Sequence, residues 1–141
     1  IQNIAERYLQ DGLDAIDQKK YDEAKALFKK ALEEKPDFKE AKYQLYMATG
    51  LRLYKKGSKN ALWDALDNFG RASFLFPKRG EPHYYTGLAY TKKDKEEFVN
   101  AIEALELAIS IEPDGKWAEA AKKEAERIRA RKKKMDAFFG R

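Results

Sequence analysis

The side chains that most often perform catalysis or bind metal ions are scarce in this chain. Its 141 residues include one histidine, His83, and no cysteine. A two-histidine zinc site, a disulfide and a cysteine–histidine dyad are therefore excluded. His83 falls in the first turn of an expected helix, where a half-packed structural role is the usual one. The sequence thus predicts no metal and no cofactor.

The acidic residues do not form a pattern that supports catalysis. Adjacent pairs such as Glu33–Glu34 point in different directions on a helix, which is typical of a solvated face. No acidic cluster has the spacing of a calcium-binding loop. No strand is expected, so no glycine-rich phosphate loop can follow one. We therefore predict that the protein is not an enzyme.

The positive charge lies at one end of the chain. The whole sequence carries a formal charge of +5, but residues 122–141 hold nine Lys or Arg against three acidic residues, a net +6 that leaves −1 for residues 1–121. A helix dipole favours cations near a helix C-terminus, which explains part of this run. Contact with a protein, an anionic membrane or a nucleic acid would explain it equally. The basic residues concerned are Arg127, Arg129, Arg131, Lys132, Lys133 and Lys134.

The overall composition is that of a folded protein. Hydrophobic residues make up 43% of the chain, which is enough to form a core. No apolar run approaches the ~20 residues of a membrane helix, and no signal sequence opens the chain. We expect a cytoplasmic protein, or a periplasmic one if an N-terminal segment has been removed.

Three segments of the chain share one pattern. In each, a large apolar residue is followed at offsets of 3, 4, 3 and 5 by Ala, a large apolar residue, Ala and Pro. The first four positions lie on one face of a helix, and the proline ends it. The segments are 21–36, 62–77 and 98–113; their positions are Tyr21, Ala24, Phe28, Ala31 and Pro36, then Leu62, Ala65, Phe69, Ala72 and Pro77, then Phe98, Ala101, Leu105, Ala108 and Pro113.

A second helical pattern precedes each segment, and in the first and third repeats it includes a glycine. Gly12 and Gly87 lie within these patterns, although glycine costs a helix about 1 kcal/mol relative to alanine. Close packing of the two helices against each other is the expected reason.

This pattern resembles the tetratricopeptide repeat family, whose unit is a helix–turn–helix of about 34 residues. The resemblance implies an all-α, right-handed solenoid of three repeats, at about 5–38, 39–79 and 80–115. A capping helix at about 115–135 and a tail at 136–141 would complete a single array over residues 1–135. Asp114 is expected to cap that last helix.

The second repeat is elongated. The prolines that close the three segments lie 41 and then 36 residues apart, so the second repeat gains about seven residues. The third gains about two near Lys92–Lys95. One long helix from about Asp37 to Lys56 would accommodate the longer insertion, with a break at Gly57–Ser58 and Ser58 or Asn60 capping the next helix. The insertion is either simply tolerated or forms a docking edge.

The resemblance implies binding of a protein or peptide in a concave groove lined by the first helix of each repeat. An apolar and aromatic groove is expected, or else packing of some of these residues between repeats. Heat-shock chaperone tails are not expected as partners, because Leu9, Leu13, Glu81 and Tyr85 at the matching positions cannot clamp a carboxylate. The predicted groove residues are Leu9, Leu13, Tyr43, Met47, Tyr84 and Leu88.

The predicted function is a scaffold or adaptor in a larger complex. Two alternatives remain. In one, the basic tail docks onto an anionic membrane or a nucleic acid. In the other, the chain forms a homo-oligomer through the long second-repeat helix.

Overall fold

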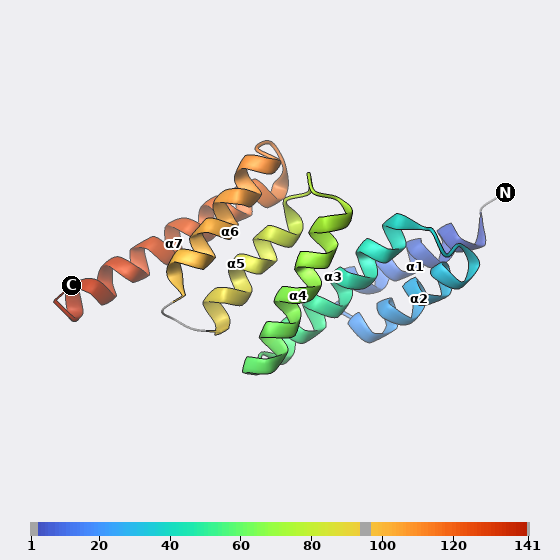
Figure 1. Ribbon diagram of the computed structural model, residues 1–141, viewed down its shortest axis with the longest axis horizontal. Helices are drawn as coiled ribbons and strands as arrows, with labels where there is room; N and C mark the ends of the chain where they lie inside the picture. The colour runs from blue at the N-terminus through green and yellow to red at the C-terminus, as the bar shows by residue number, and fades with distance from the viewer. Residues whose placement is uncertain (1–2, 94–96, 141) are drawn as a thin grey trace. The chain divides into compact units, whose positions relative to one another are not determined.

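The computed structural model describes residues 3–93 and 97–140, and these form α-helices without any strand (Figure 1). The chain divides into two compact units, residues 1–77 and 78–141. The helices are α1 (Ile4–Asp17), α2 (Tyr21–Glu34), α3 (Lys39–Lys56), α4 (Lys59–Leu75), α5 (Glu81–Lys93), α6 (Phe98–Ile111) and α7 (Lys116–Phe138).

The first unit contains two helix pairs. Short connections make α1 antiparallel to α2 and α3 antiparallel to α4, and α2 also packs against α3. An ion pair of 2.6 Å between Arg52 of α3 and Asp22 of α2 links the two pairs. The second repeat therefore packs on the first, as expected of repeat proteins.

The second unit contains the third pair and the last helix. α5 packs against α6, and α7 packs against both of them. The Gly80 N–H donates a 2.5 Å hydrogen bond to the Glu112 carboxylate, which ties the start of α5 to the end of α6. α7 thus covers the face of the third repeat that a further repeat would otherwise cover.

The repeated positions form the core of each pair, as predicted. The two alanines and the large apolar residue between them are 0% exposed in all three repeats. Each second helix also ends two residues before its proline, at Glu34, Leu75 and Ile111. In each case the N–H of the following residue bonds to the carbonyl of the second repeated alanine. Burial and helix termination therefore follow one repeated sequence pattern.

Close packing explains the helical glycines. A Cβ added to Gly12 would overlap the Phe28 ring, and one added to Gly87 would lie 2.7 Å from two Leu105 carbons. The sequence prediction is thus confirmed for both. In the second repeat, a Cβ added to Gly50 would overlap the Phe69 ring in the same way. This glycine was not identified from the sequence.

The long helix of the second repeat is also confirmed. α3 ends at Lys56 and is followed by Gly57, which has a left-handed backbone (φ 74°) that glycine adopts without strain. The Ser58 hydroxyl then accepts a 3.3 Å hydrogen bond from the Ala61 N–H and caps α4. The contact of Gly50 with Phe69 shows that the extra residues are shared between the part of α3 before Gly50 and the segment after it.

Two details at the other helix ends differ from expectation. α7 begins after Gly115 without a side-chain cap, so the prediction that Asp114 caps it is wrong. The helix also continues to Phe138, beyond the residue at which the tail was expected to begin. The extra residues predicted near Lys92–Lys95 lie partly outside the residues that the structure describes.

Substituting alanine at two glycines of the second repeat should have opposite effects. Gly50→Ala forces a methyl group into the Phe69 ring and should destabilise the fold by about 1–3 kcal/mol. Gly70→Ala, in α4, meets no atom within 4 Å and should stabilise it by up to about 1 kcal/mol. Urea unfolding of both variants measures the difference. Equal effects would contradict the packing role assigned to Gly50.

Candidate functional site

The predicted groove residues of the first repeat lie on α1 and are partly exposed. Leu9 and Leu13 are half-buried and pack beside the buried cluster around Phe28, together with Leu45 of α3. Each therefore contributes to the core and still presents part of its side chain to solvent. They are one turn apart on the same helix face.

In the second repeat, the predicted residues lie in the core instead. Tyr43 and Met47 are each only 1% exposed, and the Tyr43 ring meets the Phe76 ring edge-on at 5.4 Å. This differs from the expected groove position. Their side chains fill space within the first unit, so neither is available to a partner in this structure.

The contact of Gly50 with Phe69 explains this difference. Gly12, Gly50 and Gly87 occupy the same place in their repeats, because each faces the large apolar residue of its second helix. Counting from the glycine, the counterparts of Leu9 and Leu13 are Met47 and Leu51. Tyr43 therefore lies one turn away from the position assigned to it. Leu51, which is 8% exposed, was missed, although the glycine would have located it.

In the third repeat, Tyr84 and Leu88 of α5 are half-buried. The Tyr84 ring lies 5.1 Å from the Tyr85 ring and 5.4 Å from the Trp117 ring of α7. Burial raises the pKa of Tyr84, and nearby Glu124 raises it further. Tyr84 thus packs partly under α7, whereas Leu88 is absent from the core cluster of this unit.

A small aromatic cluster occurs where α5 meets α7. Tyr85 lies 5.4 Å from Trp117, and the Lys116 ammonium lies 4.7 Å from the centre of the Trp117 ring. Rigid aromatic rings beside a cation are common in recognition surfaces. Trp117 is not among the predicted groove residues. Its approach to Tyr85 depends on how α7 folds back, which no local pattern specifies.

His83 occupies a structural environment. It lies in the first turn of α5, and its backbone N–H donates a 3.1 Å hydrogen bond to the Gly80 carbonyl. Within residues 3–93 and 97–140, no group of three or more His, Asp or Glu side chains is arranged to bind a metal ion.

The basic residues of α7 fall into two groups. Arg127 pairs with Glu124, Arg129 pairs with Glu106 of α6, and Lys132 pairs with Asp136 at 2.7 Å. No acidic partner among the described residues pairs with the other three, Arg131, Lys133 and Lys134. About half of the predicted basic surface is therefore neutralised by neighbouring carboxylates.

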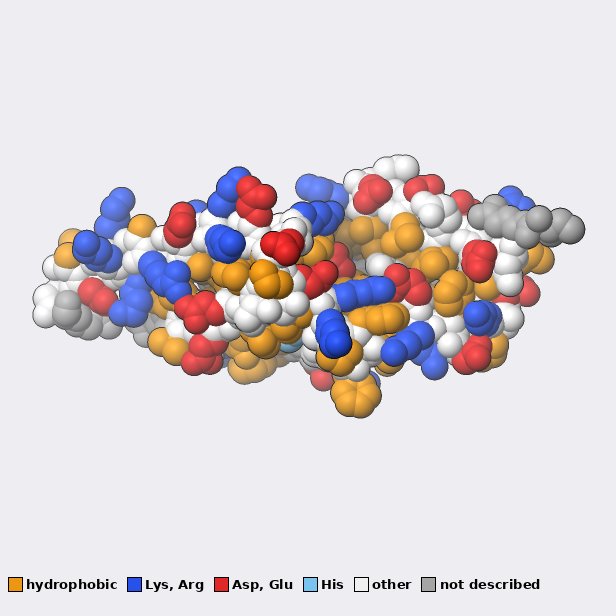
Figure 2. All heavy atoms as spheres, turned by 90° about the horizontal axis from the view of Figure 1, so that it is seen from above, with side chains coloured by type: hydrophobic (Ala, Val, Ile, Leu, Met, Phe, Trp, Pro, Cys, Tyr) orange, Lys and Arg blue, Asp and Glu red, His pale blue; other side chains and the backbone are white. Residues whose placement is uncertain are grey.

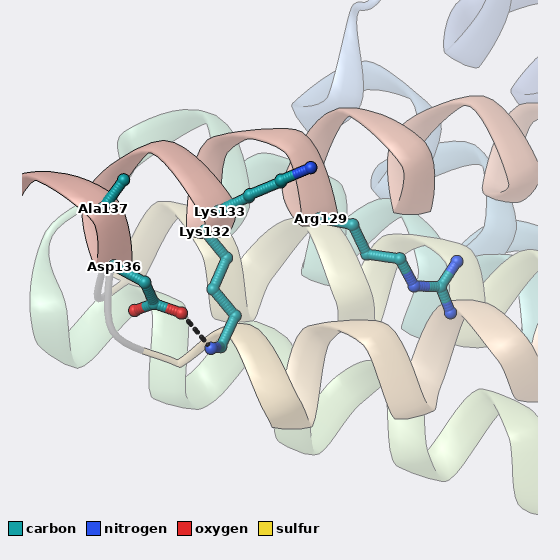
Figure 3. A pocket seen from close by; sticks show the side chains of 5 residues that line it. All are labelled: Arg129, Lys132, Lys133, Asp136 and Ala137. Atoms are coloured by element: carbon teal, nitrogen blue, oxygen red, sulfur yellow. Dashed lines mark hydrogen bonds and ion pairs between the residues drawn. The ribbon is translucent and has the colours of Figure 1, made fainter. Parts of the chain in front are cut away.

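A shallow hollow lies along the end of α7. It has a volume of about 450 Å³ and is lined by Arg129, Lys132, Lys133, Asp136 and Ala137. Figure 3 shows Lys132 and Asp136 pointing toward each other, while Lys133 extends away from that pair. Figure 2 shows acidic and basic side chains interspersed with apolar ones over the face that it displays. Among the described residues, no helix is long and apolar enough to cross a membrane.

Two parts of the sequence match models of one family. Residues 15–51 and residues 82–114 each match the tetratricopeptide repeat. The chain belongs to the tetratricopeptide repeat family. These segments include the first-helix glycines Gly50 and Gly87, so the family assignment agrees with the packing described above.

Solved structures of other tetratricopeptide repeat proteins share this fold. The Sgt2 domain from Aspergillus fumigatus is 20% identical, with a TM-score of 0.68 over 96% of this chain and 83% of that one. A tetratricopeptide repeat protein from the thermophile Thermus thermophilus is 22% identical, with a TM-score of 0.67 over 94% and 70%. The first such domain of Spaghetti (RPAP3), bound to the HSP90 peptide SRMEEVD, is 20% identical, with a TM-score of 0.62 over 90% and 91%.

These likenesses show that the fold is an all-α helical-repeat solenoid. No curated protein matches the sequence. The specific partner must therefore be inferred from the residues of this chain.

The environment of His83 predicts a pH dependence of stability. Burial lowers the pKa of His83 from its usual 6.5. The folded chain then binds this proton less well than the unfolded chain does, so stability is lost as the pH falls below 6.5. Between pH about 7.5 and about 5.5, the Tm should fall more for the wild type than for His83→Gln. Thermal unfolding followed by circular dichroism measures this, and parallel pH profiles would contradict it.

Proposed function

We propose that this protein is a non-enzymatic interaction module that binds a partner peptide and holds it within a larger complex. The observation that carries the proposal is the half-burial of apolar residues on the first helices of two repeats. Leu9 and Leu13 on α1 of the first unit, and Tyr84 on α5 of the second, pack against the core of their own unit and still expose part of their surface. Leu88 on α5 is also half-buried. Such residues are ordered before binding, so a partner gains contact area at a low entropic cost.

The chemistry of these residues suggests the kind of peptide. Leucine and tyrosine surfaces suit a segment with apolar anchors, either extended or helical and amphipathic. Tyr84 and Tyr85 would add hydroxyl groups for hydrogen bonds to the peptide backbone. Tyr43 and Met47 have no place in this surface, because both are buried.

A peptide that ends in a carboxylate cluster fits this chain poorly. Spaghetti is a structural neighbour and is bound to the HSP90 peptide SRMEEVD, but at 20% identity the likeness extends only to the fold. In this chain Leu9 and Leu13 offer no positive charge, and Glu81 would repel a carboxylate. We therefore favour an uncharged or basic segment with apolar anchors.

The basic end of α7 is less suited to be the main binding surface. Arg127, Arg129 and Lys132 already pair with carboxylates of α6 and α7. Binding to an anionic surface would compete with these pairs. The three remaining cations of the predicted basic group, Arg131, Lys133 and Lys134, are few compared with the six to ten phosphate contacts, roughly, that give strong salt-dependent binding to nucleic acid.

Selection from a random peptide library displayed on phage would test the proposal. The full chain is the bait, and the selected peptide is then titrated by fluorescence anisotropy. We expect Leu13→Ser to weaken the binding of a peptide to the first unit at least about tenfold, and Leu88→Ser to do the same for a peptide bound to the second, because each substitution removes apolar contact area. The SRMEEVD peptide should show no saturable binding.

Leu107→Ser provides a matched control, because Leu107 is an exposed leucine of α6 outside the proposed surface. It should bind the selected peptide like the wild type, and circular dichroism should show that all three variants remain folded. A peptide that binds all variants equally would place the binding site elsewhere. Failure to select any peptide, or tight binding of SRMEEVD, would contradict the proposed specificity.

A further inference from the structure

Helix α4 carries an apolar stripe on a face that is partly exposed to solvent. Trp63 is 50% exposed and Phe74 is 84% exposed. Gly70 lies between them, and the intervals of seven and four residues place all three on one face of the helix. We name Trp63, Gly70 and Phe74 the α4 stripe. Large exposed aromatic residues that share one helix face are candidates for contact with another molecule.

The stripe is specific to the second repeat. Trp63, Gly70 and Phe74 lie six residues before, one after and five after the buried Phe69. The corresponding positions in α2 and α6 are found at the same distances from Phe28 and Leu105. Aromatic residues are absent from all of them. They are Asp22, Lys29 and Glu33 in α2, and Val99, Glu106 and Ser110 in α6. The repeat architecture alone therefore does not require aromatic residues there.

Packing within the folded chain does not explain why position 70 is a glycine. A Cβ at this position would meet no atom within 4 Å, whereas Gly12, Gly50 and Gly87 all face a neighbouring side chain. Yet a helical glycine costs about 1 kcal/mol relative to alanine. A small residue in the middle of an exposed apolar face allows another helix to approach closely.

The charges beside the stripe indicate what this other helix is. Asp67 and Arg71 form a 2.9 Å ion pair within α4, and both side chains are 60% exposed. The midpoint of Asp67 and Arg71 is residue 69, and the midpoint of Trp63 and Phe74 lies between residues 68 and 69. An antiparallel copy of α4 centred there would place Trp63 beside the second copy's Phe74 and Asp67 beside its Arg71. A two-fold axis generates each of these contacts twice.

We propose that the α4 stripe binds a second copy of this chain, with the two α4 helices antiparallel about a two-fold axis. Gly70 lies next to the crossing point and admits the partner helix. The exposed ion pair between Asp67 and Arg71 contributes little within one chain, so these two residues exchange the ion pair across the axis at little cost. Arg71 also bonds to the Tyr46 side chain of α3. The inference is independent of the peptide surface, which lies on other helices.

The contact area sets the strength of the dimer. One helix pair buries less than the roughly 1,200 Å² of a standard stable interface. We therefore expect a reversible dimer with a dissociation constant in the micromolar range, on the order of 10–100 μM. Helix α3 is a poorer candidate, because its exposed residues are charged: Lys39, Lys42, Arg52, Lys55 and Lys56.

Sedimentation equilibrium of the full chain, from about 1 to about 500 μM, tests the proposal. The wild type should shift from monomer toward dimer over this range. Phe74→Ser removes an exposed ring and should raise the dissociation constant at least about tenfold without loss of helicity. Val99→Ser, at the matching place of α6, should dimerise like the wild type. A wild type that stays monomeric, or Phe74→Ser that dimerises normally, would overturn the proposal.

Charge reversal separates this dimer from other arrangements. Asp67→Arg would place arginine opposite Arg71 of the second copy, and Arg71→Asp would place aspartate opposite Asp67, so each variant alone should dimerise poorly. An equimolar mixture of the two should form a heterodimer at least as well as the wild type forms its dimer, because every cross-axis pair is then complementary. A mixture that associates no better than its components would rule out the antiparallel two-fold arrangement.

Discussion

The contact between a glycine of the first helix and a large apolar residue of the second determines how each repeat is built. Gly12 faces Phe28, Gly50 faces Phe69 and Gly87 faces Leu105. Each contact needs the absence of a Cβ on one side and a bulky side chain on the other. The alanines that flank the bulky residue are fully buried and let the helices stay close along their length. The position and rotation of each first helix then determine which of its residues can reach a partner.

This constraint explains why the first helices differ in what they expose. The residues three before and one after the glycine have the same position in every repeat, so their exposure depends on what packs around them. In α1 they remain half-buried, whereas in α3 Met47 and Leu51 are buried. In α5, Tyr84 is partly covered by Trp117 of α7. The repeats thus provide equivalent positions, and neighbouring helices decide which of them a ligand can use.

Much of the fold could be predicted because each repeat encodes it locally. The spacing of alanine, large apolar residue and proline specifies a helix face and a helix end through short-range physics, and the burial of Ala24, Ala65 and Ala101 follows it. The candidate site was predicted less well. Tyr43 was misplaced by one turn because the prolines fix the total length of the insertion but not its division around Gly50. The approach of Trp117 to Tyr85 joins helices about 30 residues apart, and no local pattern encodes it.

Gly70 differs from the helical glycines that face a neighbouring side chain, Gly12, Gly50 and Gly87. A glycine that a neighbouring side chain requires lowers the energy of the folded monomer through packing, so its helical cost is offset within the chain. Gly70 has no such neighbour, and the residues around it expose two aromatic rings and a charged pair whose order is reversed by a two-fold axis. Contact with another molecule would offset the cost of Gly70 to the helix. The proposed antiparallel copy of α4 uses the glycine, the two rings and both charges together.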